Sequence, residues 1–149
     1  MKIQKVEKNK KSYLELLLLA DEQESMIDRY LERGEMFLCT DQGEVKAECV
    51  VTKEEQGIYE IKNLATVPTA QKQGYGRALI DFVFSYYQDC NTLYVGTGDS
   101  PMTIPFYEKC GFHRSHIVKD FFLMHYDHPI FEEGQQLIDM IYLKRERIK

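Results

Sequence analysis

The stretch that decides the fold runs from Pro68 to Ile80 and reads PTAQKQGYGRALI. Two glycines, Gly74 and Gly76, flank Tyr75 immediately before apolar residues that recur with helical spacing. The N-terminus of a helix presents unpaired N–H groups and the positive end of the helix dipole, and glycine lets the backbone approach a bulky anion. The stretch therefore predicts a phosphate-binding turn that opens a helix. A plain strand-to-helix turn that needs glycine only for its shape is the alternative.

Two widespread phosphate-binding motifs do not match this loop. A P-loop has lysine and then serine or threonine after its last glycine, whereas Gly76 is followed by arginine and alanine. A dinucleotide fingerprint has glycine or alanine three residues after its second glycine, where this chain has Leu79. The pattern that fits is Q-x-x-G-x-G, formed by Gln71, Gly74 and Gly76.

The rest of the chain alternates between strand and helix patterns. The hydrophobic periodicity and the turn residues predict, in order, strand 1–6, helices 12–23 and 24–34, strands 35–40, 44–51 and 58–67, helix 79–87, strand 92–98, helix 101–110, and strands 112–126 and 137–144, with a loop at 127–135. The crossover through the third helix should set two strands parallel, which predicts a mixed sheet and an α/β (α+β) fold class. A chain of 149 residues suits a single domain, residues 1–149.

Composition narrows the classes of function. The net charge is −5, from 24 acidic and 19 basic residues, which argues against nucleic-acid binding. No apolar stretch approaches the ~20 residues of a membrane span, and the first twelve residues lack the apolar centre of a secretory signal, so a cytoplasmic location is expected. The four cysteines form no C-x-x-C pair and are expected to be free, mostly buried thiols. Histidines three apart on a strand face opposite sides, so no metal site is expected at His113 and His116 or at His125 and His128.

Two motifs together resemble one enzyme family. The Q-x-x-G-x-G loop after ATVP resembles the pyrophosphate loop of the GCN5-related N-acetyltransferase (GNAT) superfamily, which binds acetyl-coenzyme A (acetyl-CoA). The segment PFYEKCGF at 105–112 resembles the family's other recurrent segment, with Tyr107, Gly111 and Phe112 in matching places. The order of elements is also similar, over residues 1–125 and more weakly in the final strand. The resemblance implies a single-domain GNAT fold with a mixed central sheet of about six to seven strands and flanking helices.

The resemblance also implies how acetyl-CoA, the cosubstrate, would be held. Backbone amides of residues 73–77 would cradle the pyrophosphate, and Gln71 would add a side chain or a carbonyl. The strand before the loop would pair with the pantetheine arm. The implied coenzyme-binding residues are Leu64, Ala65, Val67, Gln71, Gln73, Gly74, Tyr75, Gly76 and Arg77.

The implied reaction is acetyl transfer to a primary amine of a small molecule or peptide, by direct attack in a ternary complex. Tyr107 is the candidate general acid, because a phenol, with an ordinary pKa of about 10, can protonate the departing thiolate. Glu60 is the candidate base, because an alkyl ammonium must lose a proton before it attacks. The alternatives are a Tyr107 ring that only packs on the sheet and a Glu60 side chain that is solvated beside Lys62.

The sequence does not name the acceptor. The acidic linker Asp21, Glu22 and Glu24 and the loop residues Asp99 and Ser100 could face it or could be solvated. The C-terminal segment could form a dimer strand, so a homodimer is left open. Two other classes also stay open, a module that holds acyl-CoA without turnover and a partner-binding domain that shares only the topology.

Overall fold

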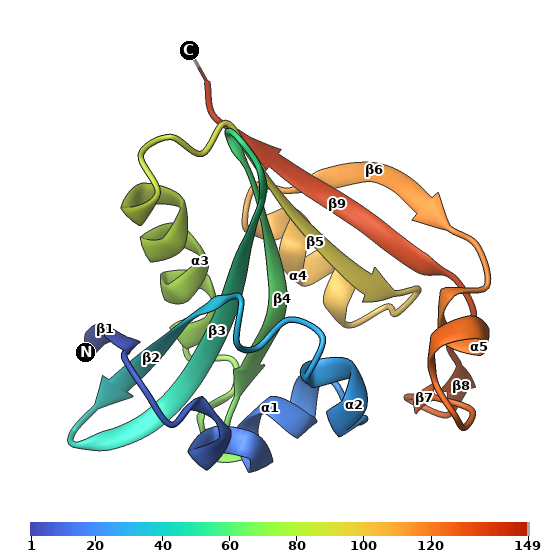
Figure 1. Ribbon diagram of the computed structural model, residues 1–149, viewed down its shortest axis with the longest axis horizontal. Helices are drawn as coiled ribbons and strands as arrows, with labels where there is room; N and C mark the ends of the chain where they lie inside the picture. Colours follow the sequence, from blue (N-terminus) through green and yellow to red (C-terminus); the bar gives the residue numbers. More distant parts are fainter. Residues whose placement is uncertain (149) are drawn as a thin grey trace. The chain divides into compact units, whose positions relative to one another are not determined.

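The computed structural model describes residues 1–148 and is shown in Figure 1. The chain divides into two compact units, Met1–Cys90 and Asn91–Lys149. The single domain expected from the chain length stays a prediction. None of the helices in the described residues has the length and apolar character that a membrane span requires.

The first unit is built on a four-stranded antiparallel sheet. Its strands follow one another along the chain, with each paired to the next: β1 (Lys2–Val6), β2 (Glu35–Asp41), β3 (Glu44–Glu55) and β4 (Ile58–Thr66). Strand β3 runs four residues beyond its predicted end. The β2–β3 turn contains Gly43 at φ +79°, a conformation that a side chain disfavours.

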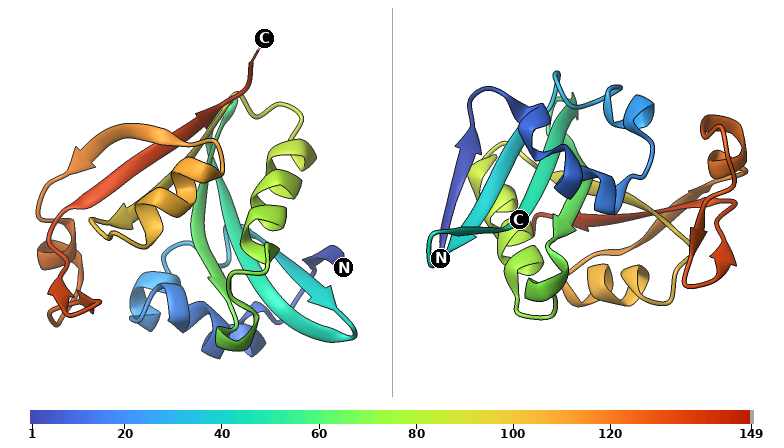
Figure 2. Two further views of the ribbon diagram at one scale, coloured as in Figure 1. Left: turned by 180° about the vertical axis from the view of Figure 1, so that it is seen from behind. Right: turned by 90° about the horizontal axis from the view of Figure 1, so that it is seen from below.

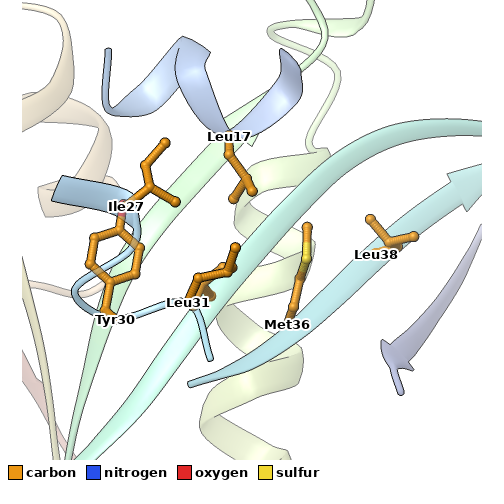
Figure 3. Packing of buried hydrophobic residues seen from close by; sticks show 7 residues of the cluster. Leu17, Ile27, Tyr30, Leu31, Met36 and Leu38 are labelled. Carbon is orange, nitrogen blue, oxygen red and sulfur yellow. The ribbon is translucent and has the colours of Figure 1, made fainter. Parts of the chain in front are cut away.

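Helices cover both faces of this sheet (Figure 2). The 3₁₀ turn Lys10–Tyr13 leads into α1 (Leu14–Ala20), and α1 and α2 (Glu24–Ile27) lie on one face. Figure 3 shows the apolar cluster that joins them to the sheet, and its buried members are Leu17, Ile27, Tyr30, Leu31, Met36, Leu38 and Val50. Burial of apolar surface stabilises a fold by roughly 25 cal/mol per Å². Packing in this cluster therefore holds the helices against β2 and β3.

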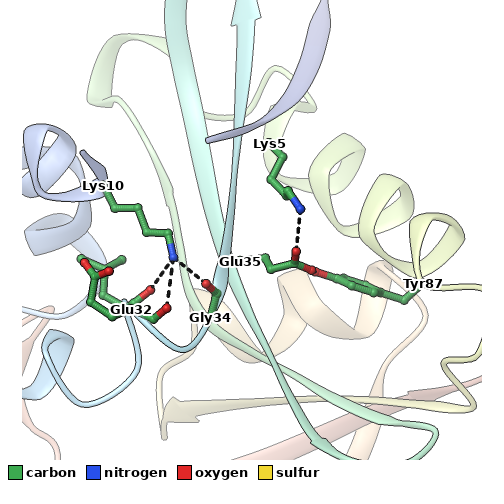
Figure 4. Close-up of polar contacts among 7 residues, drawn as sticks. Lys5, Lys10, Glu32, Gly34, Glu35 and Tyr87 are labelled. Atoms are coloured by element: carbon green, nitrogen blue, oxygen red, sulfur yellow. Dashed lines mark hydrogen bonds and ion pairs between the residues drawn. The ribbon is translucent and has the colours of Figure 1, made fainter. Parts of the chain in front are cut away.

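The second predicted helix is much shorter than expected. It ends at Ile27, and residues 28–33 continue as irregular turns in which the backbone hydrogen bonds are a mixture of i−3 and i−4 bonds. The ammonium of Lys10 donates to the carbonyls of Leu31, at 3.0 Å, and Gly34, at 2.6 Å (Figure 4). These long-range bonds hold the turns in place, and periodicity alone does not reveal them.

The opposite face of the first sheet is covered by α3 (Tyr75–Tyr86), which begins four residues before the predicted helix 79–87 and buries Leu79, Ile80, Val83 and Phe84. Phe37 of β2 meets the ring of Phe82 edge-on, at 5.6 Å between ring centroids. At the C-terminal end of α3, Tyr87 donates a hydrogen bond to Glu35, which also accepts one from Lys5 at 2.7 Å (Figure 4). This link joins the end of α3 to the start of β2.

The second unit carries the remaining strands. β9 (Met140–Glu146) lies between β5 (Thr92–Gly98) and β6 (His113–Val118) and is antiparallel to both, and α4 (Thr103–Lys109) precedes β6. The long strand predicted at 112–126 is wrong in its second half. Asp120, at φ +58°, ends the extended segment, and α5 (Phe121–His125) follows.

The predicted loop at 127–135 is also structured. A small hairpin, β7 (Phe131–Glu132) and β8 (Gln135–Gln136), lies beside α5. Phe122, Ile130 and Leu137 form a buried cluster there, so the apolar side chains of this region pack on one another. All four cysteines are free and buried, as predicted.

Candidate active site

The glycine loop has the backbone geometry of an anion-binding helix start. After the 3₁₀ turn Pro68–Ala70, Lys72 and Gly74 both adopt positive φ, +63° and +93°. The Ala78 amide donates to the Gly74 carbonyl at 3.0 Å, so the amides just before it have no acceptor within the helix. A Cβ placed on Gly74 would meet no protein atom within 4 Å, which leaves room for a bulky group.

The charges around the loop favour an anion as well. Lys72 and Arg77 are exposed, and neither forms an ion pair with any residue in 1–148. The Tyr75 hydroxyl donates to Asp41 at 2.8 Å, and this bond lowers the pKa of the Asp41 carboxyl. Tyr75 thus ties the start of α3 to the end of β2. The positive charges of Lys72 and Arg77 remain available to an anion.

Strand β4 directs part of its backbone away from β3. The Val67 amide donates to the Lys46 carbonyl at 2.9 Å, which makes this a hydrogen-bonded pair of the ladder. Because such pairs alternate with non-bonded ones, Ala65 also faces β3, whereas Leu64 and Thr66 direct their N–H and C=O groups outward. Among the sequence candidates, Leu64 therefore directs its backbone groups to the side of β4 away from β3, and Val67 has its amide occupied. The Gln71 side chain lies by the outward Thr66 carbonyl at 3.5 Å.

A bulge in β4 changes which side chains share a face. Val50 pairs with Asn63 but Val51 pairs with Ile61, so one extra residue of β4 lies between them. Tyr59 accordingly stacks on Tyr87 beneath α3, whereas Asn63 reaches α1 on the opposite side. Strict alternation along the strand would put Tyr59, Ile61 and Ala65 on one face, and the bulge instead separates Ala65 from the other two.

Glu60 is a largely buried and paired carboxylate. Its side chain is 12% exposed, and it forms an ion pair with Lys62 at 3.0 Å. The alternative of a solvated glutamate is therefore wrong. The structure places Glu60 two residues before the bulge, where a pre-positioned carboxylate is available, and the role of base stays a prediction.

Tyr107 belongs to the second unit and lies buried on α4. Its ring meets Phe112 edge-on at 5.6 Å, and its carbonyl accepts the amides of Cys110 and Phe112, both at 3.0 Å. Gly111 adopts φ +94°, the left-handed turn expected after a helix. The segment that resembled the family motif thus forms one packed helix end, which is compatible both with a catalytic role and with packing alone.

Sequence reasoning missed a polar chain beneath the acidic linker. Asp21 accepts the Tyr30 hydroxyl at 3.0 Å, and Asn63 donates both to Tyr30, at 3.0 Å, and to the Leu17 carbonyl, at 3.1 Å. Glu48 is also completely buried on this face. The signal available in the sequence was a glutamate and an asparagine at positions of otherwise apolar, alternating strands.

Ser100 is buried rather than solvated. Its hydroxyl accepts the Met102 amide at 3.1 Å and donates to Glu132 at 3.2 Å. It lines a hollow of about 350 Å³ in the second unit together with Asp99, Pro101, Ile104, Pro105, Glu108, Arg114 and Gln135. The loop at 99–101 is therefore fixed by its own bonds.

Comparison with known proteins agrees with this geometry. Residues 32–114 match the model of the acetyltransferase (GNAT) domain. The chain is 36% identical over 146 residues to the uncharacterized N-acetyltransferase YvbK of Bacillus subtilis, covering 96% of this chain and 94% of that protein.

Solved structures of acetyltransferases match this chain over almost its whole length. An acetyltransferase of Bacillus subtilis in complex with CoA is 36% identical, with a TM-score of 0.88 and 99% of each chain covered. A GNAT family acetyltransferase of Elizabethkingia anophelis with acetyl-CoA bound is 34% identical, with a TM-score of 0.92 over 98% of this chain and 97% of that one. These matches confirm the predicted α/β fold class and the cosubstrate, and the chain belongs to the GNAT family of acetyl-CoA-dependent N-acetyltransferases.

Proposed function

We propose that the chain transfers the acetyl group of acetyl-CoA to a primary amine of a small molecule or peptide, by direct attack in a ternary complex. The observation that carries this proposal is the start of α3, where glycine at φ +93°, unpaired amides and two uncompensated cations converge. Such a site suits the pyrophosphate of a coenzyme. Orientation of the thioester beside the amine would supply much of the rate.

Each remaining part of the reaction has a candidate group. The outward backbone of Leu64 would pair with the pantetheine arm, and Gln71, Gln73, Tyr75, Gly76 and Arg77 would complete the loop. Glu60 would take the proton of the ammonium, directly or through water, and Tyr107 would protonate the departing thiolate. Ala65 and Val67 would contact the coenzyme only through groups that are not used in the β3–β4 ladder.

The experiment that tests this proposal is a screen of acceptors. Purified protein and acetyl-CoA are incubated with polyamines, amino acids, aminoglycosides, aryl and alkyl amines, and peptides with free N-termini or lysines. Thiol release should rise with one class of amine, and mass spectrometry should find one added acetyl group on its nitrogen. Binding of acetyl-CoA in calorimetry, with no acetylated amine across the panel, would instead support a module that holds the coenzyme without turnover.

The proposal includes a cytoplasmic location, where acetyl-CoA is made and used, and leaves nucleic acid and membrane out as partners. A homodimer is the remaining expectation about partners. Light scattering at several protein concentrations decides between one copy and two.

A further inference from the structure

Glu48 is completely buried, although glutamate is ordinarily ionised at neutral pH and exposed to solvent. It lies on β3, is 0% exposed, and neither carboxyl oxygen has a hydrogen-bond partner. No lysine, arginine or histidine in residues 1–148 forms an ion pair with it. A buried ionised carboxylate without a partner is strongly unfavourable, so this side chain must carry something that neutralises it.

The next strand carries a second buried acceptor without a donor. Asn63 uses both N–H bonds of its amide, one to the Leu17 carbonyl and one to the Tyr30 hydroxyl. Its oxygen Oδ1 is buried and has no partner. The amide cannot be turned round, because that would set Oδ1 against the Leu17 carbonyl, which only accepts.

The strand register brings the two groups to the same place. Glu48 pairs with Ala65 and Val50 pairs with Asn63, so Glu48 and Asn63 are diagonal neighbours on one face. Long side chains reach one another across such a diagonal. The charge of Glu48 also acts on the Tyr30 hydroxyl, the group that Asn63 touches.

The two carboxyl oxygens of Glu48 and Oδ1 of Asn63 are thus three buried acceptors on diagonally neighbouring residues, and a single proton between the two side chains resolves the conflict. We propose that Glu48 is a neutral carboxylic acid whose hydroxyl donates to Asn63 Oδ1, and that this bond positions Asn63 and, through it, Tyr30 and Asp21. Asn63 directly precedes Leu64 on β4, and Asp21 begins the α1–α2 connection. The relevance of this series of hydrogen bonds to acetyl transfer rests on the proposed function, whereas the protonation of Glu48 does not.

The surroundings of Glu48 agree with this assignment. Burial raises the pKa of Glu48 well above its ordinary value of 4.5, and the nearby Ala65 amide opposes this effect only in part. The Tyr30 hydroxyl, the Tyr13 hydroxyl and, beyond Tyr30, the Asp21 carboxylate also lie on this face, while Cys49 is the adjacent residue on β3. None of them brings a positive charge that would favour ionisation.

The protonation is tested directly by infrared spectroscopy of the whole chain at pH 7. The wild-type protein should show the C=O stretch of an un-ionised carboxyl group, and Glu48→Gln should remove it. The control Glu44→Gln, at an exposed position of the same strand, should leave the band in place. Absence of the band from the wild-type protein, or its persistence in Glu48→Gln, would overturn the proposal.

Stability against pH gives a second readout. Below pH 4.5 the folded and unfolded chains both carry the Glu48 proton, and above it only the folded chain keeps it. The stability of the wild-type protein relative to Glu48→Gln should therefore fall as pH rises above 4.5, until the folded pKa is reached. A difference that does not change with pH contradicts a retained proton.

The positioning role is tested by hydrogen exchange of the peptide that spans residues 18–30. Glu48→Gln keeps a donor for Asn63 and should exchange like the wild-type protein, whereas Glu48→Leu removes the donor and should exchange faster. Equal exchange in the two variants would reject the positioning role. These measurements use neither acetyl-CoA nor an acceptor, so their failure is distinct from a failure of the proposed function.

Discussion

Tyr107 allows its hydroxyl to be tested apart from its ring. The ring packs edge-on against Phe106 and Phe112, and Tyr107→Phe preserves both contacts. If the hydroxyl protonates the departing thiolate, kcat should fall by about 10²–10⁴-fold, while the affinity for acetyl-CoA should stay the same. The half-buried Tyr94 of the same unit provides the control Tyr94→Phe, and unchanged kcat in Tyr107→Phe would make Tyr107 a packing residue.

The proposed role of Glu60 as the base can be tested by replacing its carboxylate with an amide. Glu60→Gln keeps the size of the side chain and removes the base, so kcat should drop and the acid limb of the pH–rate profile should move or vanish. The exposed Glu55, on the neighbouring strand β3, gives the control Glu55→Gln. If ionisation of the amine in solution alone shapes the profile, the limb stays in place in Glu60→Gln.

At the scale of elements, the start of α3 is the part of the fold on which coenzyme binding depends. Gly74→Ala forces a side chain into φ +93°, at a cost of roughly 1–2 kcal/mol, and adds a methyl group where the backbone must approach the pyrophosphate. The affinity for acetyl-CoA in calorimetry should weaken by about tenfold or more.

A second glycine with positive φ, Gly43, provides a control for the backbone strain that Gly74→Ala introduces. Gly43 in the β2–β3 turn has φ +79° and, like Gly74, has no atom within 4 Å of a built Cβ. Gly43→Ala should therefore lower the melting temperature to a similar extent and leave the affinity for acetyl-CoA unchanged. Equal affinities in the two variants would remove the loop from the binding site.

The end of α3 is fixed by a hydrogen bond whose strength depends on pH. Burial alone would raise the pKa of Glu35, but hydrogen bonds from Lys5 and Tyr87 outweigh it and lower the pKa from 4.5. Tyr87→Phe keeps the ring and should cost about 1 kcal/mol at pH 7, after allowance for solvent screening. Because a lowered pKa stabilises the fold only above the ordinary value, this cost should shrink as the pH falls below 4.5.

Chemical denaturation at several pH values measures that difference. The neighbouring Tyr86 is 46% exposed, so Tyr86→Phe should change stability little at any pH. A cost of Tyr87→Phe that is the same at pH 3 and pH 7 would mean that the hydroxyl does not act through Glu35.

The elements that the sequence predicted well are those whose signals are local. The glycine loop and the presence of helices α3 and α4 after it were each visible in a few adjacent residues. Contacts distant in sequence decided the rest. The ammonium of Lys10 fixes the turns after α2, and the bulge before Asn63 moves side chains to the other face of β4.

The candidate site shows the same division between local and distant signals. The loop at 71–77 could be predicted because its chemistry lies in its own backbone. The burial of Glu60 and the buried pair of Glu48 and Asn63 could not, because they depend on which strands lie beside one another and on what covers them.

At the scale of the whole molecule, we expect direct transfer with no acetylated enzyme. All four cysteines are at most 4% exposed, and burial raises the pKa of Cys39 and Cys49, so the thiolate that would attack the thioester is disfavoured. The acetyl group should therefore pass from acetyl-CoA to the amine only when both are bound.

Intact-protein mass spectrometry tests this most directly, with acetyl-CoA added first alone and then together with the amine found in the screen. We expect an unmodified protein mass in the first step, and free CoA and acetylated amine in equal amounts in the second. A protein that gains one acetyl group from acetyl-CoA alone, and then loses it to the amine after the excess coenzyme is removed, would contradict direct transfer.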